Sequence, residues 1–244
     1  MTGPPRPART PERALAYPYD IPDQSFVIDK GAVRPVTCDD DLGDLNGRIP
    51  VLAVGSNQSI RALSWKFGGP EDGPVPCVRV HLKDFDSVYC AHIAGYGSLP
   101  ATLHTSPGTT VTLFVNWLTE EQLAQMHGTE VSAKNYVFGE LSGIDMTAEA
   151  GPQLTKVGLY LGTRGALTID GCPVPLASIR AVERRWRALS QPEVMGQLQT
   201  RFACDGPQEA FIQELIDDQE ARLARCLVLR ETADPFDHPG FSVP

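Results

Sequence analysis

Two places in the sequence bring together residue types that could do chemistry. The first is Gly55-Ser56-Asn57, which follows an apolar run, Ile49 to Ala53, and precedes a helix-compatible segment, Gln58 to Phe67. A glycine lets the backbone turn tightly, and free N–H groups at a helix start attract an anion. The pattern predicts a strand, a turn and a helix whose junction forms one wall of a small-molecule pocket. Taken alone, it fits a plain helix cap better.

The second place is Glu130, at the end of a predicted helix that begins after Thr119 and carries acids in its first turn. An acid at a helix C-terminus opposes the helix dipole, so the helix itself does not favour a structural role for Glu130. The structural alternative is a solvated acid. Tyr136 follows in a predicted strand, where a half-buried tyrosine that only packs is the structural alternative.

The elements that must position these residues form no simple repeat. Strands are predicted at 49–53, 78–80, 88–93, 101–104, 111–118 and 136–140, with a turn at 105–109 and a strand pair at 157–169. This order lacks the regular strand–helix alternation of a doubly wound sheet, and no glycine-rich phosphate loop is present. We expect an α+β fold: a mixed, curled sheet or small β-barrel with flanking helices.

Patterning divides the chain into three regions. Residues 1–48 form an N-terminal extension whose Pro- and Arg-rich first part, 1–12, is predicted to be disordered, and whose segment Ser25 to Val36 adds a strand or an arm. Residues 49–172 form the main domain. Residues 173–244 form a helical C-terminal extension, with helices from Ser178 to Leu189, from Ser190 onward, and over Gln208 to Leu229.

Composition excludes several classes of function. The 244-residue chain has a net charge of −9, which argues against broad nucleic-acid binding because that needs a basic face. No apolar run is long enough to span a bilayer, and the first residues lack the apolar stretch of a secretory signal. We expect a soluble, cytoplasmic protein whose partner is a small-molecule substrate, with neither nucleic acid nor membrane.

The metal-ligating residue types show no metal-site spacing. None of the six cysteines lies in a C-x-x-C pair, and the five histidines include no H-E-x-x-H. The acidic segment Asp39 to Asp44 fits a solvated linker better than a metal site. A Cys/His hydrolase is the weaker hypothesis because no cysteine lies in a recognisable nucleophile turn. Trp65, Trp117 and Trp186 are interpreted as core or seam residues.

Four segments, in order, carry a family resemblance. They are A-V-G-S-N (53–57), H-L-K-D-F (81–85), A-T-L-H-T-S-P-G-T-T-V (101–111), and L-A-Q-M-H-G-T-E (123–130) followed by Tyr136. The span from Val51 to Tyr136 resembles the γ-glutamyl cyclotransferase superfamily. Tyr96-Gly97-Ser98-Leu99 imitates the family's loop but lacks a preceding apolar strand and a following helix, so we interpret it as a turn.

The resemblance implies an activity and roles for particular residues. Such enzymes release 5-oxoproline from γ-glutamyl amides or amines when the substrate's own α-amine attacks its γ-carbonyl. Glu130 would be the general acid/base, in a dry pocket that raises its pKa. The backbone of Val54, Gly55, Ser56 and Asn57 would hold the α-carboxylate or the oxyanion, and Tyr136 would donate a hydrogen bond into the cavity. No metal or organic cofactor is required.

Three residues differ from the family pattern, and these differences leave a second, non-catalytic function open. Val54 replaces an aromatic residue, Gln58 replaces a leucine, and Val131 replaces a glycine. The alternative is a non-catalytic module on the same fold that binds a metabolite or supports a partner enzyme. The C-terminal helices are candidates for a cap over the pocket or for the seam of a homodimer.

Overall fold

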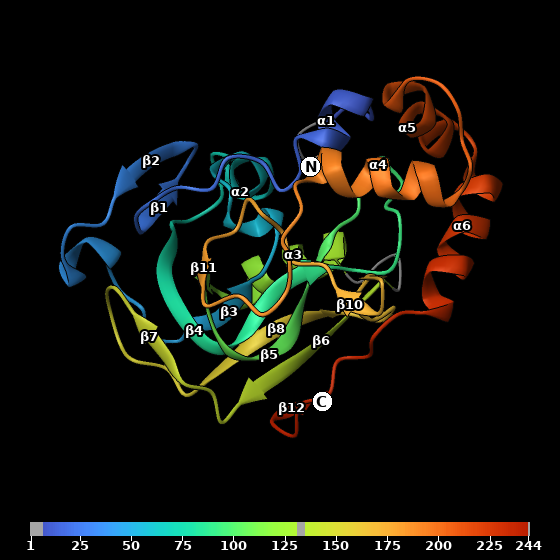
Figure 1. Cartoon of the computed structure of the whole chain (residues 1–244). Helices are drawn as coiled ribbons and strands as arrows, with labels where there is room; N and C mark the ends of the chain where they lie inside the picture. Colours follow the sequence, from blue (N-terminus) through green and yellow to red (C-terminus); the bar gives the residue numbers. More distant parts are fainter. Residues whose placement is uncertain (1–6, 131–134, 244) are drawn as a thin grey trace.

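The computed structural model describes residues 7–130 and 135–243, and its main element is a curled, mostly antiparallel sheet (Figure 1). The strands are β1 (Phe26–Asp29), β2 (Ala32–Pro35), β3 (Ile49–Ala53), β4 (Val75–Tyr89), β5 (Ala101–Leu118), β6 (Tyr136–Ser142), β7 (Met146–Ala148), β8 (Lys156–Gly162), β9 (Thr168–Ile169), β10 (Cys172–Pro173), β11 (Ala181–Val182) and β12 (Phe241–Ser242). The main path runs β12-β6-β8-β3-β5-β4-β1-β2. The predicted α+β class is confirmed.

Strand β3 lies centrally and carries the predicted site turn at its C-terminal end. It is antiparallel to β5 and parallel to β8, so both of its edges are hydrogen-bonded. Within the described residues the sheet does not close into a barrel, because the strands at its two ends, β12 and β2, do not pair with each other. The predicted curled sheet is therefore the correct alternative.

The long pair β4 and β5 differs from the prediction, which divided each of them into shorter strands. The predicted turn at residues 105–109 lies inside β5. It coincides with a register shift in β4 between Lys83 and Phe85. There Asp84 has a positive φ of 65°, and its carboxylate accepts a hydrogen bond of 2.7 Å from the Gly108 N–H. The predicted turn is therefore a β-bulge, and the hydrogen-bonded pairing of β4 with β5 continues on both sides of it.

The helices flank this sheet. They are α1 (Pro11–Leu15), α2 (Ile60–Phe67), α3 (Glu120–Glu130), α4 (Gln191–Arg201), α5 (Gln208–Asp217) and α6 (Gln219–Glu231), with one-turn 3₁₀ helices η1 (Asp39–Leu42) and η2 (Ser56–Gln58). Two predicted starts are confirmed: Thr119 Oγ1 accepts from the Gln122 N–H at the start of α3, and Ser190 with Glu193 forms a capping box on α4.

Two helix predictions for the C-terminal region are wrong. The segment Ser178 to Leu189 forms turns, bends and the two-residue strand β11, which joins β5, and Arg184 reaches the buried carboxylate of Asp86. The predicted single helix over residues 208–229 breaks at Asp218. The Asp218 side chain caps α6 by accepting from the Ala221 N–H, and Arg222 donates to carbonyls at the end of α5. Local capping therefore outweighs the amphipathic periodicity.

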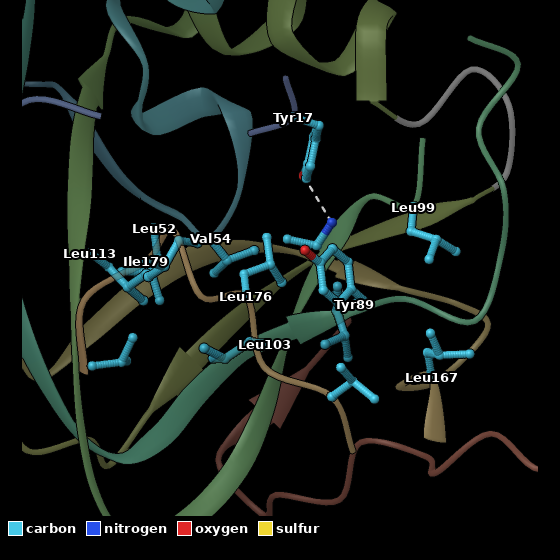
Figure 2. Close-up of a cluster of buried hydrophobic side chains, with 14 of the residues drawn as sticks. Tyr17, Leu52, Val54, Tyr89, Leu99, Leu103, Leu113, Leu167, Leu176 and Ile179 are labelled. Atoms are coloured by element: carbon cyan, nitrogen blue, oxygen red, sulfur yellow. Dashed lines mark hydrogen bonds between the residues drawn. The ribbon is translucent and has the colours of Figure 1, made fainter. Parts of the chain in front are cut away.

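Both chain ends pack against one large core. Figure 2 shows part of this cluster, where Leu52, Tyr89 and Leu103 from the sheet lie with Tyr17 from the N-terminal arm. Residues of α5 belong to the same cluster, and α1 lies beside α4 and α5 (Figure 1). This packing brings the N-terminal arm to the end of β3.

The N-terminal arm is more ordered than predicted. Residues 1–6 lie outside the described residues, but helix α1 begins at Pro11 with Thr10 as its cap, so the predicted disorder of residues 1–12 is wrong there. The hairpin β1–β2 confirms the strand prediction for Ser25 to Val36. None of the helices in the described part of the chain combines the length and apolar character needed to cross a bilayer.

Candidate functional site

The turn after β3 is built closely against the N-terminal arm. Gly55 leads into η2, and Ser59 caps α2 by accepting a 3.1 Å hydrogen bond from the Ala62 N–H. The predicted helix therefore begins two residues later than expected, with Ser59 as its cap in place of Ser56 or Asn57. A β-carbon at Gly55 would overlap the Tyr17 hydroxyl and lie 3.0 Å from the Ala101 β-carbon. Glycine is required because these two neighbours approach the backbone.

A cavity of about 430 Å³ opens beside this turn, within the usual size range of ligand pockets. All six site residues predicted from the sequence line it: Val54, Gly55, Ser56, Asn57, Glu130 and Tyr136. They come from the end of β3, the C-terminus of α3 and the start of β6. The structure thus gathers the residues of three distant segments around one space.

Asn57 and Lys66, which also line the cavity, hold the Glu130 carboxylate. Its Oε1 accepts a hydrogen bond of 3.1 Å from Asn57 Nδ2 and forms an ion pair with Lys66 Nζ. Lys66 also donates to Asn57 Oδ1 at 2.8 Å, which closes a triangle of three side chains. The Lys66 side chain is 6% exposed and that of Glu130 is 20% exposed, so the pair is shielded while the carboxylate keeps some access to the cavity.

Lys66 changes the expected ionisation of Glu130. Burial raises the pKa of the Glu130 carboxyl, but the Lys66 charge and hydrogen bonds from Lys66, Asn57 and Thr129 lower it further, and the pKa lies below its ordinary value. The prediction of a raised pKa is therefore wrong. Near neutral pH the group is a carboxylate, which can accept a proton.

Two tyrosines that line the cavity hydrogen-bond to the backbone of Ala101, one to its carbonyl and one to its N–H. The Tyr136 hydroxyl donates to the Ala101 carbonyl at 2.8 Å, so its proton is engaged with the backbone and not with the cavity. The Tyr17 hydroxyl oxygen accepts from the Ala101 N–H at 2.8 Å, the contact drawn in Figure 2. The proton of Tyr17 therefore remains for another acceptor.

Two of the departures from the family pattern lie inside the protein, and Val131 lies outside the described residues. The Val54 side chain belongs to the core, and its carbonyl accepts from Ser87 Oγ at 2.6 Å. Only backbone and a small apolar surface are therefore offered to the cavity. Gln58 is fully buried, and neither amide atom has a hydrogen-bond partner among the described residues.

Several lining residues were not predicted from the sequence. Lys66 carried one signal: it falls three residues after Leu63 on the buried face of α2, where a charge needs a partner. Trp65, interpreted as a core or seam residue, lines the cavity. The N-terminal arm supplies further lining residues, namely Pro7, Arg9, Arg13, Tyr17 and Tyr19. No pattern in the sequence connects that arm with the turn.

A cysteine and a histidine do meet near the cavity. Cys90 Sγ lies 3.2 Å from His92 Nδ1. Burial raises the pKa of the Cys90 thiol to about 12 and lowers the pKa of His92 to about 4. Because the thiolate is the nucleophilic form, this fully buried pair does not support a cysteine hydrolase.

Comparisons with known proteins give similarity in fold alone. No protein-family model matches the chain. No curated protein matches it either. A protein from Arabidopsis thaliana, determined in solution, is 18% identical over 49% of this chain and 72% of that chain, with a TM-score of 0.35. A gamma-glutamyl cyclotransferase is 16% identical over 81% of this chain and 94% of that chain, with a TM-score of 0.38.

Proposed function

We propose that the chain cleaves a small γ-glutamyl-like amide by intramolecular attack, releasing 5-oxoproline and an amine. One observation carries this proposal: the Glu130 carboxylate is enclosed, ionised and hydrogen-bonded to Asn57 of the Gly-Ser-Asn turn. A carboxyl that faced bulk solvent away from the turn would have favoured a binding or structural role.

In the proposed reaction Glu130 takes a proton from the substrate's α-ammonium group. The freed amine attacks the γ-carbonyl carbon, and the carbonyl oxygen becomes an oxyanion beside the backbone of Gly55 and Ser56. The bond from that carbon to the leaving nitrogen then breaks as Glu130 returns its proton to that nitrogen. The attacking nitrogen loses its second proton through solvent to the released amine, which leaves the neutral lactam of 5-oxoproline and an ammonium product. Proton transfer of this kind contributes roughly 10² to 10⁴ in rate. Enclosure in the cavity adds proximity of amine and carbonyl.

Lys66 fits this scheme as a positioning residue. Its ammonium group keeps Glu130 ionised, and with Asn57 it fixes the carboxylate. A substrate ammonium arriving beside Glu130 would compete with Lys66 for the same oxygen, so proton transfer requires the ion pair to loosen. The cytoplasmic location and a homodimer remain predictions.

The test is a panel of γ-glutamyl amines and dipeptides incubated with the purified protein, with 5-oxoproline as the readout. We expect turnover by the native chain and a loss of at least about 10² in kcat for Glu130→Gln. Unchanged activity of Glu130→Gln would disprove the assigned role. Glu140→Gln is the matched control, since Glu140 is exposed on β6 and pairs only with Lys156 among the described residues.

The alternative function, a non-catalytic module that binds a metabolite or supports a partner enzyme, is favoured by one observation. Glu130 already has a cationic partner in Lys66, an arrangement that a purely structural ion pair would also have. This alternative predicts that members of the same panel bind to the native chain, measured by calorimetry, without any release of 5-oxoproline.

A further inference from the structure

The solvent-exposed side of the cavity lining, which we call its mouth, carries an excess of positive charge that the proposed reaction does not use, and Arg9 and Arg61 are exposed there. Its lining includes three arginines, Arg9, Arg13 and Arg61, and we call this set the arginine collar. Two come from the N-terminal arm and one from α2. The chain as a whole has a net charge of −9, so a concentration of arginines in one place runs against its composition.

Aromatic rings, and not acids, hold two of these arginines. The Arg13 guanidinium lies 4.8 Å from the centre of the Tyr96 ring, and its Nε donates to the Tyr19 hydroxyl at 3.1 Å. The Arg61 guanidinium lies 4.9 Å from the centre of the Tyr19 ring. Tyr19 thus joins Arg13 to Arg61 across the mouth, and stacking on a ring leaves the edge of a guanidinium able to donate.

Arg9 is the third member of the collar. A β-carbon at Gly95 would lie 3.8 Å from Arg9 Nη1, so this guanidinium stands over bare backbone of the cavity wall. Neither Arg9 nor Arg61 hydrogen-bonds to another residue in the described ranges. Arg13 uses Nη1 for the Pro7 and Ala8 carbonyls, which folds the arm back on itself.

The collar is electrostatically uncompensated. In the part of the chain that the structure describes, no carboxylate forms an ion pair with any of its three members. Glu130 is the only acidic residue among those found to line the cavity, and Lys66 already neutralises it. Low-dielectric walls focus such a field toward the opening.

A solvated surface is the simple alternative, because exposed arginines usually contribute little. Three features distinguish the collar from such a surface: its members line a cavity, two are fixed on rings, and none has an acidic partner. From these contacts we infer that the arginine collar binds an anionic group, a carboxylate or a phosphate, on the substrate portion that leaves as the amine. This rests on the proposed function, which places the reacting end at Glu130 and the leaving end at the mouth.

Three γ-glutamyl amides that differ only in the leaving amine test this inference. The amines are ethylamine, which is neutral as an amide, glycine, which adds a carboxylate, and 2-aminoethyl phosphate, which adds a phosphate. We expect the native chain to show a KM at least about tenfold lower for one or both anionic amides, as charge-assisted hydrogen bonds would give. The anionic amide with the lower KM identifies the anion that the collar binds. The ratio of the ethylamide KM to that KM should fall at high salt.

The variant that decides the matter is Arg9→Gln combined with Arg61→Gln. We expect KM for the preferred anionic amide to rise about tenfold more than KM for the ethylamide, with kcat changing less than KM. Arg34→Gln is the control, because Arg34 is exposed on β2 and does not line the cavity, and it should keep the native preference. Equal KM values for the three amides, or a preference that survives in the double variant, would overturn the inference.

The two proposals fail in distinguishable ways. If none of the amides yields 5-oxoproline, the proposed function fails, and the collar is judged by calorimetric titration of the same compounds. Tighter binding of an anionic amide that is lost in the double variant would still support the collar. Equal binding of all three, or no binding, would overturn it.

Discussion

Lys66 decides in which ionisation state Glu130 meets a substrate. The two residues are 64 positions apart in the chain, yet they form one shielded ion pair, and Lys66 also donates a hydrogen bond to Asn57. Because the pKa of Glu130 is lower in the folded protein than in the unfolded chain, its ionisation stabilises the fold. The pair stabilises the fold above the unfolded pKa of about 4.3, and this contribution is lost as the pH falls through the lower folded value.

Replacing Lys66→Met should reverse the pKa shift of Glu130. Without the ammonium group, burial becomes the dominant influence and raises the pKa of the carboxyl. The acidic limb of kcat/KM should therefore move to higher pH, measured as the release of 5-oxoproline across a pH series. Lys156→Met serves as a control, since that lysine is exposed on β8 and pairs with Glu140. An acidic limb that stays in place would contradict the role given to Lys66.

Tyr17 is the second residue whose substitution gives a sharp result. The change Tyr17→Phe removes a proton donor from the cavity and the acceptor of the Ala101 N–H. We expect a loss of about threefold to tenfold in kcat/KM and about 1–3 kcal/mol in the free energy of unfolding, because a buried N–H loses its partner.

Tyr136→Phe is the comparison, since the Tyr136 hydroxyl donates to the carbonyl of the same residue, Ala101. It should destabilise the fold with a smaller effect on catalysis. If Tyr136→Phe impaired kcat/KM more than Tyr17→Phe, the donor role would belong to Tyr136, as the sequence predicted.

The element that carries most of the site is the unit formed by β3, the turn and α2. Its order could be predicted because an apolar run and a glycine are local signals, and β3 was predicted with its observed bounds, although the capping serine is Ser59 and not Ser56. The ladders of β4 and β5 were predicted in pieces, since the bulge that joins them depends on a contact between Asp84 and Gly108. Contacts between distant segments leave no periodicity in a sequence.

Gly55→Ala tests how closely the turn and the N-terminal arm fit. The new methyl group would overlap the Tyr17 hydroxyl, so we expect a loss of about 1–3 kcal/mol in the free energy of unfolding, typical of overpacking. In the Tyr17→Phe background the same change should cost less, because the oxygen is gone. Denaturant unfolding of the four proteins gives the coupling. Additive effects would mean that the arm is not packed on the turn.

Two segments outside the main ladders of the sheet pack back onto it, namely the N-terminal arm and the segment that contains β11. The N-terminal arm completes the cavity and packs beside α4 and α5, while the segment after β10 returns to the sheet through β11 (Figure 1). The sequence could not reveal this return to the sheet: residues 178–189 have helical periodicity, but Arg184 pairs with a buried carboxylate on β4, and the segment forms β11, turns and bends in place of a helix. Asp86 Oδ2 accepts from Arg184 Nε at 2.7 Å, and Oδ1 accepts from Arg184 Nη2 at 3.1 Å.

Arg184→Met should therefore destabilise the whole fold in a pH-dependent way. The Asp86 side chain is fully buried, and its removal from water raises its pKa even with Arg184 in place. Without the arginine the uncompensated carboxylate should cost about 3–5 kcal/mol near neutral pH. A raised folded pKa gives stability that is present below the unfolded value of about 3.9 and lost as pH rises through the folded value. The deficit relative to the native chain should thus shrink on acidification.

The double variant Asp86→Asn with Arg184→Met separates charge from packing. It leaves no buried ion, so its unfolding free energy, measured by denaturant titration, should exceed that of Arg184→Met at pH 7 and vary less between pH 7 and acidic conditions. If the double variant were as unstable as Arg184→Met at every pH, the guanidinium would act through packing alone. A higher free energy of unfolding in the double variant than in Arg184→Met would show that Arg184 stabilises the fold by compensating the charge of Asp86.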